Sequence, residues 1–167
     1  MSEIVIIRRG VVEDLPQIVD IYNYYVTETH ITFDVEPFAV AERVEWFEDF
    51  STHERYQLFV AVAGNKVRGY AHARALKPKA AYETSVEVSV YLAPDVEMRG
   101  LGSRLYRALL AYLKKVDVHR AYGVIALPNE ASIGLHLKFG FEALHLQSEV
   151  GRKFGRYIDV QWFEKKF

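Results

Sequence analysis

Cysteine is absent from the sequence, and so are long apolar runs. Without thiols the chain has no disulfide, no thiolate zinc ligand and no cysteine nucleophile, so any catalysis relies on other groups. No stretch approaches the ~20 apolar residues that a membrane-spanning helix needs. Residues 1–9 also lack the basic start and apolar run of a signal peptide. We therefore expect a cytoplasmic protein without a membrane partner.

An excess of charge of either sign is missing as well. The chain has 21 Lys and Arg against 22 Asp and Glu, which gives a formal net charge of −1. A nucleic-acid-binding surface needs excess positive charge, so we expect no nucleic-acid partner. The histidines other than His136 show no metal-ligand spacing, and we predict no metal site.

What is present suffices for one folded domain. Half of the 167 residues are apolar and 14% are aromatic, enough for the core of a single α/β domain spanning residues 1–167. Apolar periodicity separates strands from helices. The predicted strands are 4–8, 58–63, 66–75, 85–92, 122–127, 141–146 and 157–163. The predicted helices are 13–26, 38–50, 103–115 and 129–139.

Two of these elements have a distinctive pattern. Strand 85–92 alternates, with valines on one face and a polar face formed by Ser85, Glu87, Ser89 and Tyr91. In helix 38–50, one apolar stripe is predicted to contain Val40, Val44 and Phe47.

A glycine turn is the strongest indication of a binding site. Gly100-Leu101-Gly102 follows strand 85–92 and opens helix 103–115, so backbone N–H groups at a helix N-terminus would surround an anionic phosphate. Arg99 and Arg104 add positive charge beside it. Alternatively, the glycines only allow positive φ in a tight turn, and two glycines alone favour that interpretation. The dinucleotide fingerprint fails because Leu105 replaces its third glycine, and no Walker pattern is present.

Several segments together resemble the GNAT superfamily of acetyltransferases. They are strand 86–92, the turn 97–102, and the stretch from Leu127-Pro128-Asn129 to Gly140-Phe141. Segments 27–37, 82–87, 102–106, 135–136 and 153–156 further resemble the phosphinothricin and methionine sulfoximine acetyltransferase branch. The resemblance implies a single mixed, mostly antiparallel sheet flanked by helices, an α/β (α+β) fold. It also implies acetyl transfer from acetyl-CoA to the amino group of a small amino-acid-like molecule, and a homodimer, to which segment 157–163 is a candidate contributor.

The cofactor residues follow from the turn and the resemblance together. They are Val88, Val90, Arg99, Gly100, Leu101, Gly102, Ser103 and Asn129. Asn129 is also the expected N-cap of its helix, and both roles can coexist. The turn departs from the family at Glu97, where Gln or Arg is usual. An acid there repels phosphate if it points inward, or faces solvent while backbone amides and Arg99 bind the phosphate; we favour the second arrangement.

Amine acetylation requires a neutral nitrogen and a proton for the departing thiolate. Glu87 is the candidate base, because it lies on the polar face of the strand that resembles the cofactor-binding strand. The alternative is that Glu87 only pairs with Lys79 or an arginine. His136 is the candidate proton relay, since the branch has histidine at this position. The alternative for His136 is plain packing against its helix neighbours, and Tyr106 is a further candidate acid or a core residue.

The acceptor site is predicted from charge and aromatic residues. Lys77, Lys79 and the cluster 152–156 suit a carboxylate or phosphinate, and Phe33 and Tyr82 suit apolar walls. Ser85 and Glu87 complete the candidate substrate residues. Leu76 departs from the branch, which tends to have tryptophan there.

Two other functions stay open at this point. A GNAT enzyme with another acceptor would act on a polyamine, an aminoglycoside or a protein N-terminus. A catalytically silent module would bind acyl-CoA without turnover.

Overall fold

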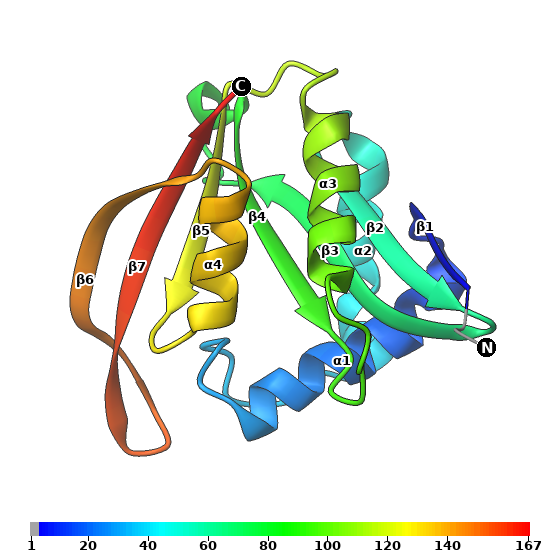
Figure 1. The fold of residues 1–167 in the computed structure, drawn as a ribbon, viewed down its shortest axis with the longest axis horizontal. Helices are drawn as coiled ribbons and strands as arrows, with labels where there is room; N and C mark the ends of the chain where they lie inside the picture. The colour runs from blue at the N-terminus through cyan, green and yellow to red at the C-terminus, as the bar shows by residue number, and fades with distance from the viewer. Residues whose placement is uncertain (1–3) are drawn as a thin grey trace.

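The computed structural model describes residues 4–167, which form a seven-stranded sheet with helices on both faces (Figure 1). The strands are β1 (Val5–Arg9), β2 (Gln57–Ala63), β3 (Lys66–Ala75), β4 (Ser85–Leu92), β5 (Arg120–Ala126), β6 (Glu142–Lys153) and β7 (Arg156–Lys166). The helices are α1 (Leu15–Glu28), α2 (Val44–Thr52), α3 (Leu101–Leu113) and α4 (Glu130–Lys138), with short 3-10 turns η1 (Val12–Asp14), η2 (Val40–Arg43) and η3 (Ala80–Tyr82). No helix within residues 4–167 is both long and apolar enough to cross a membrane.

The sheet is mixed and mostly antiparallel, as predicted. Its strand order is β1-β2-β3-β4-β5-β7-β6. Only β4 and β5 run parallel, and every other neighbouring pair is antiparallel. Helix α3 provides the crossover that a parallel pair requires, and it lies between β4 and β5 in the chain.

The two faces of the sheet have separate cores. On β3, Ala71 and Ala73 belong to the core under α3, whereas Tyr70 belongs to the core under α1 and α2. This alternation follows from the two-residue period of a strand. Figure 1 shows α3 and α4 in front of the sheet and α1 and α2 behind it. The polar face of β4 therefore points toward the α1 and α2 side.

Helix α2 begins later than predicted and buries a different face. Residues 38 and 39 are not helical, and η2 precedes the α-helix. Val40 and Val44 are each 38% exposed, whereas Trp46 and Phe50 are only 9% exposed. These two aromatics lie four residues apart on one face, and Trp46 packs on Phe50 edge-on at 5.0 Å between ring centroids. The larger aromatic area decides which face is buried.

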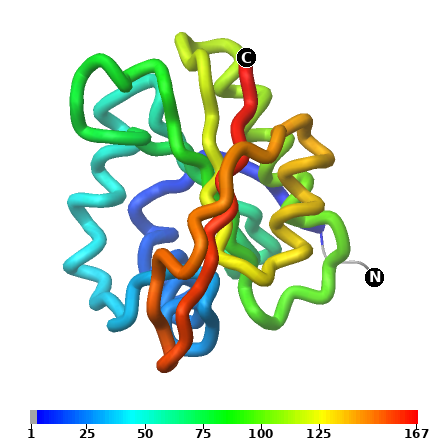
Figure 2. Tube along the Cα trace, turned by 90° about the vertical axis from the view of Figure 1, so that its left-hand side faces the viewer, coloured from blue at the N-terminus to red at the C-terminus, as the bar shows by residue number. Residues whose placement is uncertain are grey.

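The C-terminal hairpin is longer than predicted. Strands β6 and β7 pair from Glu142 to Lys153 and turn through Phe154 and Gly155, both at positive φ. Figure 2 shows the two strands running side by side along the molecule. The sequence pattern missed residues 147–153 because they are largely polar and β6 is an edge strand whose side chains are mostly exposed. No apolar alternation marks them.

Candidate active site

The parallel strands β4 and β5 separate partway along their length. They pair only between Ser85–Glu87 and Arg120–Tyr122, although β4 continues to Leu92 and β5 to Ala126. Beyond Glu87 the facing edges of the two strands have no strand partner. Backbone N–H and C=O groups need partners, so this opening suits an extended ligand that carries amides.

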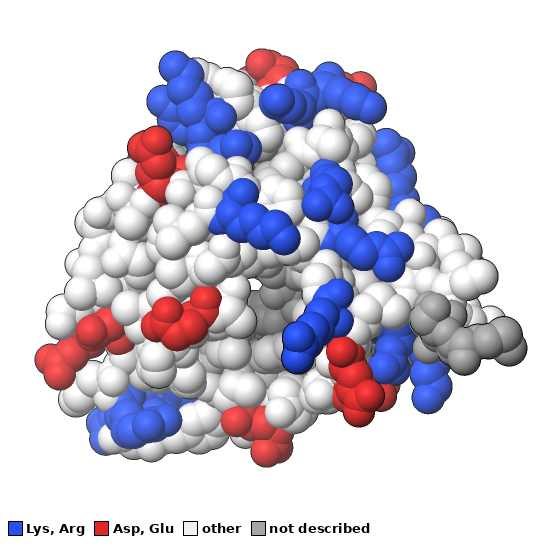
Figure 3. Space-filling view, in the orientation of Figure 1, with Lys and Arg blue, Asp and Glu red and all other residues white. Residues whose placement is uncertain are grey.

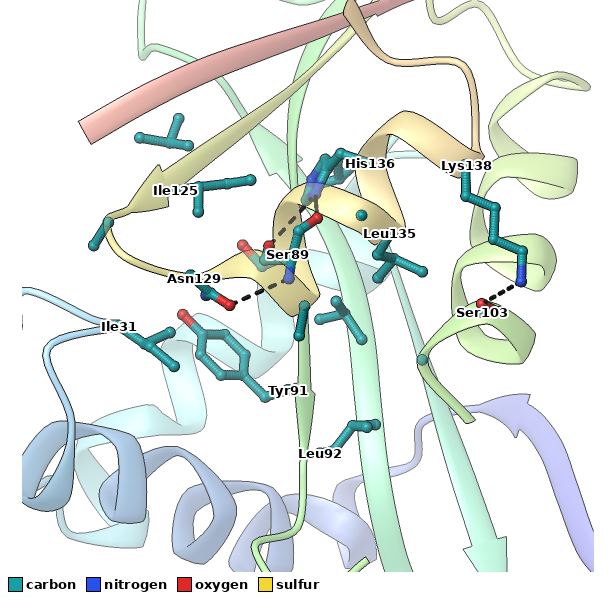
Figure 4. Close-up of a pocket in the computed structure, with 18 of the residues that line it drawn as sticks. Ile31, Ser89, Tyr91, Leu92, Ser103, Ile125, Asn129, Leu135, His136 and Lys138 are labelled. Atoms are coloured by element: carbon teal, nitrogen blue, oxygen red, sulfur yellow. Dashed lines mark hydrogen bonds between the residues drawn. The ribbon is translucent and has the colours of Figure 1, made fainter. Parts of the chain in front are cut away.

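A first cavity of about 440 Å³ lies in this opening. It lies against the edges of β4 and β5, the first turn of α3, and one side of α4 (Figure 4). Six predicted cofactor residues line it: Val88, Val90, Gly100, Gly102, Ser103 and Asn129. Figure 3 shows a hollow near the middle of this face, with Lys and Arg side chains above and beside it.

The glycine turn has the geometry of an anion site. Gly100 is the N-cap of α3 with φ of 81°, a left-handed conformation that strongly favours glycine. The free N–H groups of the first turn and the helix dipole both favour an anion here. Lys138 of α4 donates to Ser103 Oγ at 3.0 Å, which brings a cation to the same helix end. Lys138 was not predicted as a site residue, although it lies one helical turn after Leu135, which lines the same cavity.

The remaining residues of the turn point elsewhere. Leu101 is 1% exposed and belongs to the core, and Arg99 is exposed and does not line the first cavity. Arg104 donates to the carbonyl oxygen of Val5 at 2.8 Å. Glu97 lines a separate cavity together with Leu101 and Val5. The acidic departure from the family pattern is therefore directed away from the first cavity.

Asn129 and His136 extend into the first cavity from α4 (Figure 4). Asn129 Oδ1 accepts from the backbone N–H of Ser132 at 3.2 Å, as expected for an N-cap. Its carboxamide nitrogen has no hydrogen-bond partner within the described residues, so that group is available to a ligand. Both expected roles of Asn129 are compatible with this position.

His136 lies in a closely fitted space. It is 3% exposed, and a Cβ on Gly123 would lie 2.2 Å from His136 Nε2. Its Nδ1 lies 2.8 Å from the carbonyl oxygen of Ser132, and its Nε2 lies 2.9 Å from Tyr106 Oη. Because a carbonyl only accepts, we assign the imidazole proton to Nδ1, and Tyr106 then donates to Nε2. Burial lowers the pKa of His136, so the ring is neutral near pH 7.

A second cavity of about 510 Å³ lies on the polar face of β4. The two cavities share Ile31, Ser89, Tyr91, Val124 and Ala126 in their walls. They therefore meet where β4 and β5 have separated. A ligand in the first cavity and a second ligand in the other cavity would approach each other at this junction.

Glu87 lies in the second cavity, directly opposite Arg74 in the register of β3 and β4. Burial raises the pKa of the Glu87 carboxyl, and the nearby charge of Arg74 opposes part of that shift. A carboxylate with a raised pKa is a better proton acceptor at neutral pH. Arg74 in turn forms an ion pair with Asp49.

The second cavity balances two cations against two anions. Arg43 and Arg74 line it together with Asp34 and Glu87, and Tyr22 donates a hydrogen bond to Asp34. A zwitterionic amino acid carries one charge of each sign, and it would find a partner for both. No sequence pattern indicated Arg43, Asp34 or Arg74. Arg74 lies opposite Glu87 only through the register of β3 and β4, which was not predicted.

The structure separates the predicted substrate residues. Phe33 and Glu87 line the second cavity, whereas Lys77, Lys79, Tyr82 and Ser85 do not line either cavity. Lys77 Nζ lies 5.5 Å from the centroid of the Tyr82 ring, and Tyr82 is 38% exposed.

The basic cluster 152–156 also lies outside the walls of the two cavities. Within it, Lys153 is buried and donates to the carbonyl oxygen of Thr32 at 2.8 Å. It therefore attaches the tip of the β6–β7 hairpin to the loop that contributes Thr32 and Phe33 to the second cavity.

Known proteins are similar to this chain in sequence and in fold. The model of the acetyltransferase (GNAT) domain family matches residues 4–162. A phosphinothricin N-acetyltransferase from Streptomyces coelicolor is 49% identical over 95% of this chain and 94% of its own length. An L-methionine sulfoximine/L-methionine sulfone acetyltransferase from Pseudomonas aeruginosa is 36% identical over 95% and 92%.

A solved structure gives the same result. The GNAT superfamily phosphinothricin acetyltransferase from Sinorhizobium meliloti, in complex with AcCoA, superimposes with a TM-score of 0.92. It is 30% identical and covers 98% of this chain and 88% of that chain. The predicted fold and the predicted resemblance are both confirmed, and the chain belongs to the GNAT acetyltransferase family.

Proposed function

We propose that this chain transfers the acetyl group of acetyl-CoA to the amino group of a small amino acid of the phosphinothricin, methionine sulfoximine or methionine sulfone type. The observation that carries the proposal is the junction of the two cavities beside Ser89 and Tyr91, with Glu87 in the second cavity. The relatives' names describe acceptors of this type. We place residues 1–167, as one domain, in the cytoplasm, where acetyl-CoA is a common metabolite.

The residues of the first cavity suit acetyl-CoA. The backbone N–H groups of Gly100–Ser103, with Lys138, would hold its pyrophosphate. Arg99 adds an exposed positive charge beside the same turn. The unpaired edge of β4 at Val88 and Val90 offers backbone partners to the amides of the pantetheine arm. When bound, acetyl-CoA supplies the electrophilic carbonyl carbon of a thioester.

Glu87 is the proposed base. An α-amino group has a pKa of about 8 in model peptides, so most acceptor molecules are ammonium ions at neutral pH. The Glu87 carboxylate would accept one ammonium proton, directly or through water, and leave a neutral nitrogen that attacks the thioester. Burial raises the pKa of Glu87, which increases its proton affinity for this step.

His136 is the proposed second participant. Its hydrogen bonds restrict how it can act, because its one proton is on Nδ1 and faces the Ser132 carbonyl. It can give that proton to the departing thiolate only if Nε2 takes the Tyr106 proton in the same step. Burial raises the pKa of Tyr106 well above its usual range, so loss of its proton is costly, and the phenolate would have to recover a proton from solvent before the next cycle. The relay therefore depends on Tyr106 as well as on His136.

Arg74 is the proposed partner for the α-carboxylate of the acceptor. It lies opposite Glu87, and a carboxylate two bonds from the reacting nitrogen belongs near the base. An arginine suits a carboxylate because it presents paired N–H donors. This assignment replaces Lys77 and Lys79, which lie outside the cavity walls.

The charges also bear on the alternatives. The second cavity has no excess of negative charge, because Arg43 and Arg74 balance Asp34 and Glu87, so it offers no net attraction to a polyamine or to an aminoglycoside, which are polycations. A catalytically silent module does not need a half-buried carboxylate with a raised pKa in the second cavity, and Glu97 points away from the first cavity. Both observations favour an enzyme with an amino-acid acceptor.

We also propose a homodimer, but through a different segment from the one expected. Ile158, Val160 and Phe163 are buried within the chain, and β7 is paired on both of its edges, with β5 and with β6. The outer strand β6 instead exposes Leu144 by 44% and Leu146 by 51%, and an unpaired apolar edge invites a second copy. Sedimentation would show the dimer at micromolar concentration. A monomer at that concentration would refute it.

The function is tested by thiol release from acetyl-CoA with a panel of acceptors. The panel contains phosphinothricin, methionine sulfoximine, methionine sulfone, glutamate and spermidine. Turnover with the first three and none with spermidine supports the proposal. If no amine supports turnover while calorimetry detects acetyl-CoA binding, the chain is a silent binding module.

A further inference from the structure

Arg43 presents an unmatched guanidinium group inside the second cavity. It lies at the end of η2 and lines the cavity wall. The guanidinium carbon is 4.1 Å from the centroid of the Trp46 ring, 4.9 Å from that of Phe38 and 5.2 Å from that of Tyr22. These contacts hold the group against three aromatic rings. Within residues 4–167, Arg43 has no hydrogen bond and no ion pair.

This arrangement is unlike that of the other cavity arginine. Arg74 has Asp49 as an ion-pair partner, whereas Arg43 keeps five N–H donors without an acceptor. Arg43 is half-buried, and its donors face the second cavity without an acceptor from the protein. Burial accordingly lowers the pKa of Arg43. An acidic ligand would supply the missing acceptors.

The position of Arg43 indicates which part of a ligand it meets. The guanidinium carbon of Arg74 is 5.9 Å from the Trp46 centroid, so both cations lie near the same indole. Arg74 is the one opposite Glu87 and thus belongs to the amino end of the acceptor. Arg43 comes from η2, so it would contact a part of the acceptor that lies farther from the reacting amino group.

We propose that Arg43 binds an anionic oxyacid on the side chain of the acceptor, in particular a phosphinate, while Arg74 binds its α-carboxylate. The inference rests on the proposed function and adds to it a residue that favours acceptors with a second, distal acid over neutral ones. A cationic ligand is excluded from the aromatic rings because Arg43 already covers them. Acceptors with a neutral sulfone use the same cavity without this ion pair.

The kinetic test compares phosphinothricin with methionine sulfone in the wild type, Arg43→Gln and Arg43→Lys. A hydrogen bond to a charged group typically changes binding affinity by a factor of about 10 to 100. Arg43→Gln should therefore lower kcat/KM for phosphinothricin at least ~10-fold more than for methionine sulfone, with the loss mainly in KM. Arg43→Lys should restore part of it. Arg55→Gln, at a surface arginine paired with Asp117, is the matched control. It should leave the ratio of kcat/KM for the two acceptors unchanged.

Equal losses for both acceptors in Arg43→Gln would mean that Arg43 only supports the packing of Trp46, and would overturn the proposal. Unchanged kinetics would overturn it as well. Both outcomes leave the proposed function intact, because wild-type turnover is measured in the same series.

A binding measurement separates the two hypotheses when turnover fails. The chain has two tryptophans, Trp46 and Trp162, so Trp162→Phe leaves Trp46 as the only indole, directly beneath Arg43. Phosphinothricin, titrated without acetyl-CoA, should change Trp46 fluorescence saturably, and adding Arg43→Gln should weaken that binding at least ~10-fold. Binding without turnover would refute the proposed function and support the role of Arg43. No saturable change, or equal affinity in the two variants, would overturn the role of Arg43.

Discussion

Arg74 and Glu87 face each other across β3 and β4, so the proposed base and its nearest cation share one position in the sheet. The charge of Arg74 lowers the pKa of Glu87 and opposes the larger effect of burial. The pair therefore sets the pH at which the base is ionised. It also connects acceptor binding with proton removal.

Removing the positive charge should shift the acidic limb of the pH profile. In Arg74→Met, the pKa of Glu87 rises because only burial remains, and the carboxylate needed for catalysis forms at higher pH. The limb of kcat/KM that reports Glu87 should therefore move to higher pH, and KM for the acceptor should increase. Arg55→Met is the control, and it should leave both the acidic limb and the KM for the acceptor unchanged. A limb that stays in place in Arg74→Met would contradict the assignment of Glu87.

Lys138 should contribute to acetyl-CoA binding. It lies at the first turn of α3 through its contact with Ser103, and one lost charge-assisted contact typically costs about 1.5–3 kcal/mol. Lys138→Gln should raise KM for acetyl-CoA about 10-fold or more and leave KM for the acceptor nearly unchanged. Lys115→Gln, at an exposed lysine outside both cavities, should have no effect. Equal KM values for acetyl-CoA in Lys138→Gln and in the wild type would show that Lys138 does not contact acetyl-CoA.

Tyr106→Phe tests the proton relay without opening the core. The substitution keeps the ring that packs on Phe141 and His136 but removes the proton that Nε2 needs. If His136 relays protons, kcat should fall about as far in Tyr106→Phe as in His136→Ala, while both KM values change little. A wild-type kcat in Tyr106→Phe, measured by thiol release, would mean that His136 lines the first cavity without relaying a proton.

Gly123 makes room for His136, and an added methyl group there should disturb it. A Cβ at residue 123 would lie 2.2 Å from His136 Nε2, so Gly123→Ala should lower the free energy of unfolding by about 1–3 kcal/mol. Gly134→Ala is the matched control, because a Cβ there meets nothing and alanine favours the helix. Thermal unfolding should therefore shift down in the first variant and up in the second. A Tm of Gly123→Ala at or above that of the wild type would contradict the observed fit.

The cofactor half of the site could be predicted from the sequence because its residues lie in local motifs. The turn at Gly100 and the N-cap at Asn129 follow from short-range spacing, and both residues line the first cavity. The same kind of spacing predicted the polar face of β4, which places Glu87 in the second cavity. The assigned chemistry of Glu87 and His136 stays a prediction.

The acceptor half could not be predicted in the same way. Arg74 reaches the site through the register of two strands, and Arg43 reaches it because α2 starts at Val44 and turns Trp46 inward. Both depend on contacts between distant segments, which periodicity does not report. The predicted Lys77 and Lys79 were near Glu87 in sequence only. The aromatic packing of Trp46 and Phe50 likewise outweighed the valine stripe.

The central claim is that Glu87 removes the proton from an amino-acid acceptor held at the junction of the two cavities. The most direct measurement is the pH dependence of kcat/KM for phosphinothricin in the wild type and in Glu87→Gln, an isosteric change that cannot accept the proton. General-base catalysis typically contributes a factor of about 100 to 10,000. We predict a loss of that order at neutral pH, the disappearance of the acidic limb, and unchanged affinity for acetyl-CoA. A Glu87→Gln enzyme that retains the wild-type rate and the wild-type acidic limb would contradict the account.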